Sequence, residues 1–182
     1  MGMILQWKPD SSAPLWDEFS EGKNHFFRDI NLDHIKQIGP SCVATTLAMI
    51  ARSTGADVSV DYFKKITNSQ SPHTWSNALK EFGMQLAYCN NDVRRIDNYI
   101  EELVSYDDLF LVSFYSIDPP SDPDSNGKLC TAHIVTLSGN KIFDTAKSRF
   151  NGGVINATNY PRLERQTKRI FRVVPLGYPR CV

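Results

Sequence analysis

Apolar positions at helical spacing mark the first half of the chain. Over residues 42–54 apolar side chains recur three or four positions apart, and Gly55 follows as a C-terminal cap. The pattern predicts a helix that begins at or near Cys42. A short helix is predicted over residues 61–66, and a third over residues 71–83, which opens with a Ser-Pro pair and ends at a glycine.

The second half of the chain alternates shorter apolar runs with turn residues. The runs predict strands at 84–89, 109–116, 132–138, 141–146 and 169–175, and an amphipathic helix at 93–104. Gly139-Asn140 is a two-residue hairpin turn signal between two of these strands. Because most helices precede an antiparallel sheet, the sequence predicts an α+β fold, with an N-terminal helical part packed on a C-terminal sheet.

Length and composition are those of an ordinary globular protein. The 182 residues are expected to form a single domain spanning 1–182. Twenty basic residues balance twenty acidic ones, which gives no reason to expect nucleic acid as a partner. A basic cluster near the C-terminus is interpreted as a solvated face; it comprises Arg162, Arg165, Lys168, Arg169 and Arg172.

The chain shows neither a secretory signal nor an apolar stretch long enough to span a membrane. It is therefore expected to be cytoplasmic where it is made, with no membrane partner, and export by a signal-less route stays open. Residues 117–128, which are rich in Pro, Asp and Ser, predict an exposed loop. The oligomeric state is not indicated.

The four cysteines are too sparse for a disulfide scaffold, so free thiols are expected. Cys130 and His133 form a Cys-x-x-His step that suggests zinc, but no second pair of ligands accompanies it. We therefore expect no metal and no cofactor.

Cys42 is a candidate nucleophile because a helix N-terminus stabilises a thiolate through its N–H groups and dipole. The preceding Gly39-Pro40-Ser41 interrupts any earlier helix, which leaves Cys42 at the start of the next one. A buried structural cysteine is the alternative interpretation.

His133 and Asp144 supply the partners that such a nucleophile requires. If Gly139 and Asn140 form the turn, Ser138 pairs with Lys141, and outward counting places His133 and Asp144 diagonally on one face of the hairpin. A carboxylate at that position can accept a hydrogen bond from the imidazole and orient it as a base. His34 is the alternative base.

Gln37 lies five residues before Cys42, near the same predicted helix start. Its side-chain amide, together with the Cys42 backbone N–H, could stabilise an oxyanion. A solvated loop glutamine is the alternative.

These segments resemble the C39-type peptidases, the bacteriocin-leader-processing branch of the papain-like cysteine peptidase superfamily. QIGPSCVATTLAMIARSTG is similar to their nucleophile segment, and AHIVTLSGNKIFDTA to their His strand followed by a strand bearing Asp. The resemblance implies a papain-like fold in which Gln37, Cys42, His133 and Asp144 hold the oxyanion, nucleophile, base and orienting positions. Val43 stands where that group usually has Gly, so the resemblance implies membership at the superfamily level.

Two enzymatic functions fit this site, a cysteine peptidase as the first interpretation and a glutamine deamidase or transglutaminase-type effector as the alternative. A cysteine peptidase would cleave a peptide bond of a protein or peptide substrate through a thioester on Cys42. A glutamine deamidase or transglutaminase-type effector would form the same thioester from a glutamine side chain. A catalytically silent binding module is the third interpretation, and the complete Cys, His and Asp set argues against it.

Overall fold

The computed structural model describes residues 25–89, 93–116, 132–178 and 181–182. The predicted loop at 117–128 lies outside these residues, as does Cys130, the cysteine of the Cys-x-x-His step.

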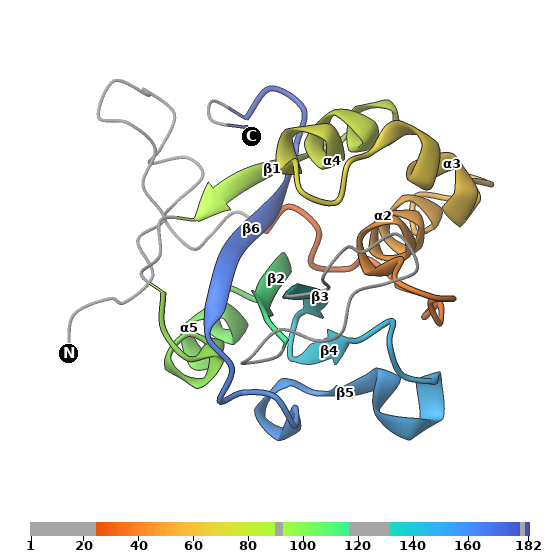
Figure 1. Ribbon diagram of the computed structural model, residues 1–182. Coiled ribbons are helices and arrows are strands. Elements are labelled where there is room, and N and C mark those ends of the chain that lie inside the picture. Colours follow the sequence, from red (N-terminus) through yellow and green to blue (C-terminus); the bar gives the residue numbers. More distant parts are fainter. Residues whose placement is uncertain (1–24, 90–92, 117–131, 179–180) are drawn as a thin grey trace.

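Six strands form one antiparallel sheet in the order β1-β6-β2-β3-β4-β5 (Figure 1). The strands are β1 (Met84–Cys89), β2 (Leu109–Tyr115), β3 (Ala132–Ser138), β4 (Lys141–Phe143), β5 (Val154–Asn156) and β6 (Thr167–Pro175). The helices are α2 (Cys42–Arg52), α3 (Val60–Ile66), α4 (Pro72–Leu79) and α5 (Ile100–Ser105). Single turns are η1 (Lys80–Phe82), η2 (Ile96–Asn98), η3 (Arg149–Gly153) and η4 (Ala157–Asn159). The α+β prediction is confirmed.

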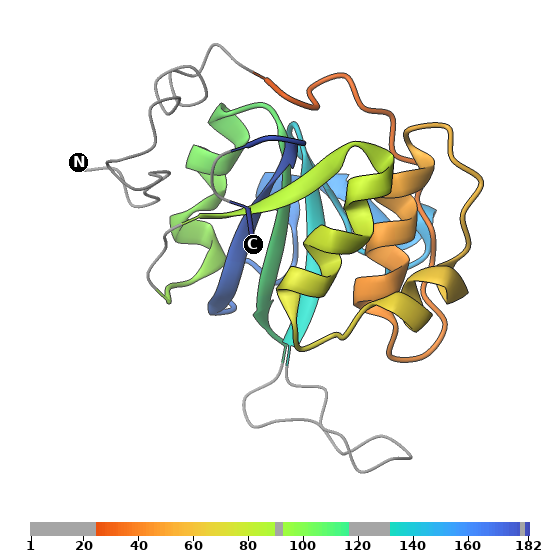
Figure 2. The same ribbon diagram turned by 90° about the horizontal axis from the view of Figure 1, so that it is seen from above.

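The sheet separates two hydrophobic cores. Helices α2, α3 and α4 cover one face and α5 covers the other (Figure 2). Side chains alternate along β2, so Leu111 packs under the three helices while Phe110 faces α5. Large buried side chains fill both cores, such as Phe63 on the first face and Tyr99 on the second. The predicted helical part packed on a sheet is thus confirmed.

Helix α2 begins at Cys42, as predicted, because the residues before it cannot continue a helix. Gly39 has a φ of 65°, a left-handed conformation that glycine adopts without strain, and Pro40 follows it. The Ser41 hydroxyl donates to the Ile38 carbonyl (2.9 Å) and does not cap the helix. Together with a first turn that contains no acidic residue, this leaves the positive end of the helix dipole facing Cys42.

The hairpin of β3 and β4 has the predicted register, with Ser138 opposite Lys141. Gly139 takes a φ of 59° in the turn. The second strand is shorter than predicted, since β4 ends at Phe143 and not at residue 146. The Asp144 N–H donates to the Gly153 carbonyl (2.8 Å), which turns the chain away from β3.

The single helix predicted over residues 93–104 is wrong. Two short pieces, η2 and α5, stand in its place because the chain before them pairs with residues 163–166. The N–H groups of Ile96 and Asp97 donate to the carbonyls of Arg165 and Leu163 (both 2.9 Å). Because these N–H groups are used by a distant segment, residues 93–104 do not form one continuous helix.

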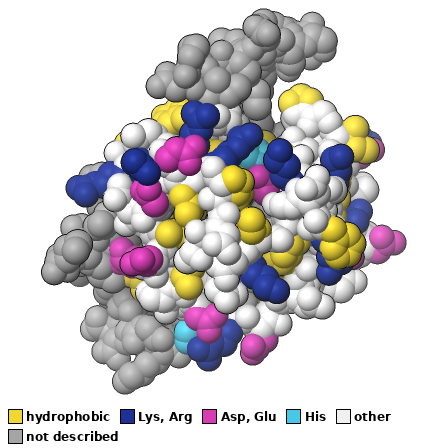
Figure 3. Space-filling view, turned by 90° about the horizontal axis from the view of Figure 1, so that it is seen from below, with side chains coloured by type: hydrophobic (Ala, Val, Ile, Leu, Met, Phe, Trp, Pro, Cys, Tyr) yellow, Lys and Arg dark blue, Asp and Glu magenta, His cyan; other side chains and the backbone are white. Residues whose placement is uncertain are grey.

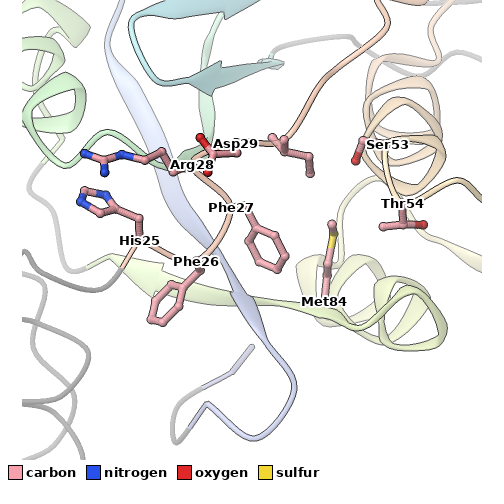
Figure 4. Close-up of a pocket in the computed structure, with 9 residues that line it drawn as sticks. His25, Phe26, Phe27, Arg28, Asp29, Ser53, Thr54 and Met84 are labelled. Atoms are coloured by element: carbon pink, nitrogen blue, oxygen red, sulfur yellow. The ribbon is translucent and has the colours of Figure 1, made fainter.

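Residues 25–30 form a strap of bends and one turn that is fixed to Asp108. The Asp108 carboxylate accepts the backbone N–H groups of Phe26 (3.0 Å) and Phe27 (2.8 Å) and pairs with Arg172, whose guanidinium lies 4.6 Å from the Phe26 ring centre. Figure 4 shows Phe27 beside Met84 in the hollow under this strap. The solvated-face interpretation is therefore wrong for Arg172, which is 4% exposed.

The charged surface is mixed. On the face seen in Figure 3, acidic and basic side chains alternate with apolar ones, and neither sign gathers into a continuous area. Among the described residues, no helix has the length and apolar character to cross a membrane.

Candidate active site

Cys42, His133 and Asp144 come together from α2, β3 and the residue after β4. The His133 Nε2 hydrogen bonds to the Asp144 Oδ1 (2.7 Å), and the Cys42 side chain is one of the groups that raise the pKa of the imidazole. Because Nε2 is used by the carboxylate, Nδ1 is the ring nitrogen left for the thiol. The predicted contact between His133 and Asp144 is thereby confirmed, although Asp144 lies just beyond the strand.

Every oxygen of the Asp144 carboxylate is held. Oδ1 accepts the His133 bond and the backbone N–H of Ala146 (2.9 Å), while the Tyr160 hydroxyl donates to Oδ2 (2.7 Å). Asp144 is 2% exposed. The carboxylate therefore faces the imidazole in a single fixed orientation.

Aromatic rings complete the wall behind the imidazole. Phe114 lies opposite His133 in the sheet, and the two rings meet edge-on with centres 5.7 Å apart. The same Phe114 contacts Tyr160, at 6.3 Å between ring centres. Phe114 therefore packs against both the His133 imidazole and Tyr160, whose hydroxyl supports Asp144.

The electrostatics of the pair favour charge on both members. Burial disfavours the imidazolium, but hydrogen bonds to Asp144 and Cys42 and the negative charges of both outweigh it and raise the pKa of His133 from 6.5 to about 9. Burial likewise opposes ionisation of Asp144, yet hydrogen bonds from His133, Tyr160 and Ala146 and the imidazolium charge lower its pKa to about 2. At neutral pH the His133 imidazolium is therefore paired with an ionised Asp144 carboxylate.

Gln37 is joined to the residue that follows Asp144. Its backbone N–H donates to the Thr145 carbonyl (2.7 Å), and its side-chain carbonyl accepts the Thr145 hydroxyl (2.8 Å). The side-chain nitrogen donates to the Gly39 carbonyl (3.0 Å). These bonds connect the segment before Cys42 to the residue after Asp144. Gln37 is therefore held by hydrogen bonds and is not a solvated loop side chain.

His34, the alternative base, holds the backbone. Its Nε2 hydrogen bonds to the Asp144 carbonyl (2.9 Å), whereas the contact with Cys42 belongs to His133. A Cβ atom at Gly153 would lie 2.7 Å from the same His34 nitrogen, so this close packing requires glycine. His34 and Gly153 together fix the chain that carries Asp144.

Cys42 lines one of the hollows on the described surface, and a further hollow lies elsewhere. The first, of about 410 Å³, is lined by the start of α2, including Cys42, and by the end of α3 with the loop after it. The second, of about 530 Å³, is the one under the strap (Figure 4). There the Ser53 and Thr54 hydroxyls both donate to carbonyls of α2, so neither is placed as a nucleophile with a base.

No group of three or more metal-ligating side chains occurs among the described residues. In this part of the chain His133 has its partners in Asp144 and Cys42.

Comparison with known proteins supports the fold. No family model matches the chain, and no curated protein matches it significantly. The peptidase domain of Streptococcus ComA, a bifunctional ABC transporter involved in quorum sensing, matches 80% of this chain and 99% of its own with a TM-score of 0.50 and 16% sequence identity. A double-glycine-motif protease from an AMS/PCAT transporter, solved in complex with its leader peptide, matches 80% of this chain and 91% of its own, with a TM-score of 0.48 and 16% identity.

The chain thus has the α+β fold of the ComA peptidase domain. The resemblance inferred from the nucleophile and His–Asp segments is confirmed at the level of the fold.

The sequence did not predict two aromatic residues that support the site, Tyr160 beside Asp144 and Phe114 beside His133. Tyr160 lies 16 residues further along the chain, beyond a strand, β5, that the hydrophobic pattern does not predict. Phe114 falls within a predicted buried strand, but its contact with His133 depends on how β2 pairs with β3. Both contacts depend on tertiary pairing, for which the local pattern contains no signal.

Tyr160→Phe should lower the free energy of unfolding by about 1–3 kcal/mol, because a buried carboxylate oxygen loses its donor. The pKa of Asp144 should rise from about 2, since the Tyr160 bond is one of the interactions that lower it. Urea unfolding measures the first effect, and carboxyl ¹³C NMR titration the second.

Tyr106→Phe is the matched control. It removes a hydroxyl that hydrogen bonds to Glu102 (3.1 Å), outside the site. An equal change in the Asp144 pKa in both variants would contradict the role assigned to Tyr160.

Proposed function

We propose that this protein is a papain-like cysteine peptidase that cleaves a peptide bond in a protein or peptide substrate. One observation carries the proposal: a buried imidazole hydrogen bonds to the Asp144 carboxylate and interacts electrostatically with a cysteine at a helix start. Nucleophile, base and orienting acid are then connected in series. The likeness of the fold to a peptidase domain supports the same conclusion.

In the proposed reaction, the Cys42 thiolate attacks the substrate carbonyl carbon, with its proton held on His133. The oxyanion accepts hydrogen bonds from the Cys42 backbone N–H, which has no partner within the helix, and from the second N–H of the Gln37 amide. The His133 imidazolium then donates its proton to the leaving amine, which departs and leaves a thioester. Water attacks the thioester while neutral His133 takes its proton, and the acid product is released.

Asp144 remains ionised throughout and keeps the imidazole in the required orientation. Its supports are Tyr160, the Ala146 N–H and the backbone contact from His34. Gln37 couples this group to the loop before the nucleophile through Thr145.

A glutamine deamidase would use the same thioester and release ammonia instead of a peptide amine. No contact in the described residues favours this alternative over peptide cleavage. Intact mass spectrometry of protein substrates after incubation distinguishes the outcomes: fragments indicate cleavage, a gain of one dalton indicates deamidation, and summed masses indicate crosslinking.

Cys42 should be the first of the described thiols to react with iodoacetamide near neutral pH. Cys89 is fully buried, and burial raises the pKa of its thiol well above 9.0; burial also raises the pKa of Cys181. Cys42 is partly exposed and paired with an imidazolium. Peptide mapping after brief labelling tests the order, and faster labelling of Cys89 or Cys181 would contradict the assignment of Cys42 as nucleophile.

The rate of cleavage should fall on the alkaline side with an apparent pKa near 9. Below that value His133 keeps the proton that the leaving amine needs, and above it the proton is lost. The pH profile of kcat/KM measures this limb.

Cys42→Ala provides an independent check by NMR titration of the His133 ring. Because the hydrogen bond and charge of Cys42 help to raise the His133 pKa, their removal should lower it. An unchanged ring pKa would mean that the two side chains do not interact.

A further inference from the structure

We propose that the hollow beside Cys42 is a substrate subsite that takes an acidic side chain, Asp or Glu, and that Lys64 is its specificity-determining residue. This assignment rests on the proposed peptidase function and names the kind of substrate that the site accepts. Three features support it: the hollow is next to Cys42, hydrogen bonds fix its far wall, and Lys64 is its charged lining residue.

Cys42 is one of the residues that line the hollow. Its lining consists of Pro40 to Ala44 on one side and of Lys64 with Thr67, Asn68 and Ser69 on the other. Figure 2 shows α3 lying across the start of α2, which brings these two sides together. A substrate whose carbonyl meets Cys42 from this side therefore places a neighbouring side chain against the end of α3.

The far wall is preorganised by hydrogen bonds, one of them from a buried tryptophan. The Asn68 carbonyl accepts the indole N–H of Trp75 (2.7 Å), and the Asn68 N–H donates to the Thr74 hydroxyl (2.9 Å). Trp75 is 3% exposed in the core, so the loop is anchored from beneath. Thr67 is fixed in turn by its N–H bond to the Phe63 carbonyl (3.0 Å). A wall fixed in this way can select substrates because it does not rearrange around each one.

Apart from Cys42 itself, the hollow has one charged side chain among its described lining residues. Among the described lining residues, Lys64 has the only basic or acidic side chain, and the others on its side of the hollow are polar and uncharged. The Lys64 ammonium is 3.8 Å from the Asp61 carboxylate one turn earlier, and both are exposed, which makes this a weak surface pair. An acidic substrate side chain that enters the hollow meets a cation with no opposing carboxylate among the described lining residues.

Alkylation of Cys42 tests the subsite before any natural substrate is identified. Iodoacetate has a carboxylate and iodoacetamide is neutral, so the ratio of their rates at Cys42 reports the charge of the hollow. Lys64→Gln should lower this ratio by about threefold, and Lys64→Glu should lower it further, as expected for one charge several ångströms away in water. Lys65→Gln is the control, because Lys65 lies in the same helical turn but does not line the hollow.

A second probe tests an acidic side chain directly. Two tripeptide vinyl sulfones that differ only in Glu or Gln beside the reactive group should label Cys42 at different rates in the full chain, with Glu faster. The difference should disappear in Lys64→Gln. Equal rates for the two peptides in the parent protein would overturn the subsite.

The alkylation outcomes separate the two proposals. An unchanged ratio in Lys64→Gln, or an equal fall in Lys65→Gln, overturns the subsite while rapid labelling by iodoacetamide leaves the nucleophile intact. Slow labelling of Cys42 by iodoacetamide in the parent protein overturns the proposed function and the subsite with it.

Discussion

Replacing either Cys42 or His133 by Ala should reduce kcat/KM for peptide cleavage by about 10⁴-fold or more, and replacing both should cost little beyond either alone. In the proposed reaction the two side chains act as one unit, because the Cys42 thiol must give its proton to the His133 imidazole before it attacks. Cleavage of a peptide found by mass spectrometry, followed at several substrate concentrations, measures the loss.

Asp144→Ala should retain more activity than either variant, because the orienting acid does not bond to the substrate. Cys181→Ser is the matched thiol control, and it should keep full activity since Cys181 lies outside the site, bonded to the Tyr178 carbonyl. Full activity in His133→Ala would show that another group serves as base, and His34 would be the first to examine.

The hairpin at the centre of the site could be predicted because its information is local. Gly139 and Asn140 determine the turn, the turn determines the register, and period-two alternation puts His133 and Asp144 on one face. The position of Cys42 is predicted in the same way, from a helix breaker followed by helical periodicity. In both places the start of the element and its register agree with the structure, although β4 ends at Phe143 and Asp144 follows it.

The errors occur where distant segments pair. The helix expected over 93–104 is broken by hydrogen bonds to residues 163–166, about 70 positions away. Tyr160 reaches Asp144 only because β5 adds to the edge of the sheet. Such pairings depend on the whole fold, and no periodicity in either segment indicates them.

Arg172 is the clearest case of a charge with a misleading sequence context. It stands among five basic residues that suggest a solvated face, and Asp108 follows another aspartate in a turn. In the structure the two are buried against each other: the Arg172 Nε and Nη2 both donate to the Asp108 Oδ2, at 3.0 and 2.5 Å. Alternation along β6 turns Arg172 inward while its neighbours Arg169 and Lys168 remain partly exposed.

Asp108→Asn should lower the free energy of unfolding by about 3–5 kcal/mol, the usual effect of removing one partner of a buried ion pair. The substitution puts an amide donor or a neutral oxygen against the Arg172 guanidinium, which is left charged and buried. The same carboxylate also accepts the N–H groups of Phe26 and Phe27, so the strap loses part of its anchor. Urea unfolding followed by circular dichroism measures the loss.

Asp107→Asn isolates the effect of burial in the same turn. Asp107 pairs with Arg28 (2.7 Å) with both side chains about half exposed, and its φ of 49° is tolerated by asparagine. We expect a loss of about 1 kcal/mol or less in the free energy of unfolding, as for other surface pairs.

Replacing both members of the buried pair, as Asp108→Ala with Arg172→Met, should recover part of the stability lost in Asp108→Asn, because no buried charge then remains. Recovery should stay incomplete, since the N–H groups of the strap still lack the carboxylate. Equal losses in Asp107→Asn and Asp108→Asn would mean that the buried pair contributes no more than a surface one.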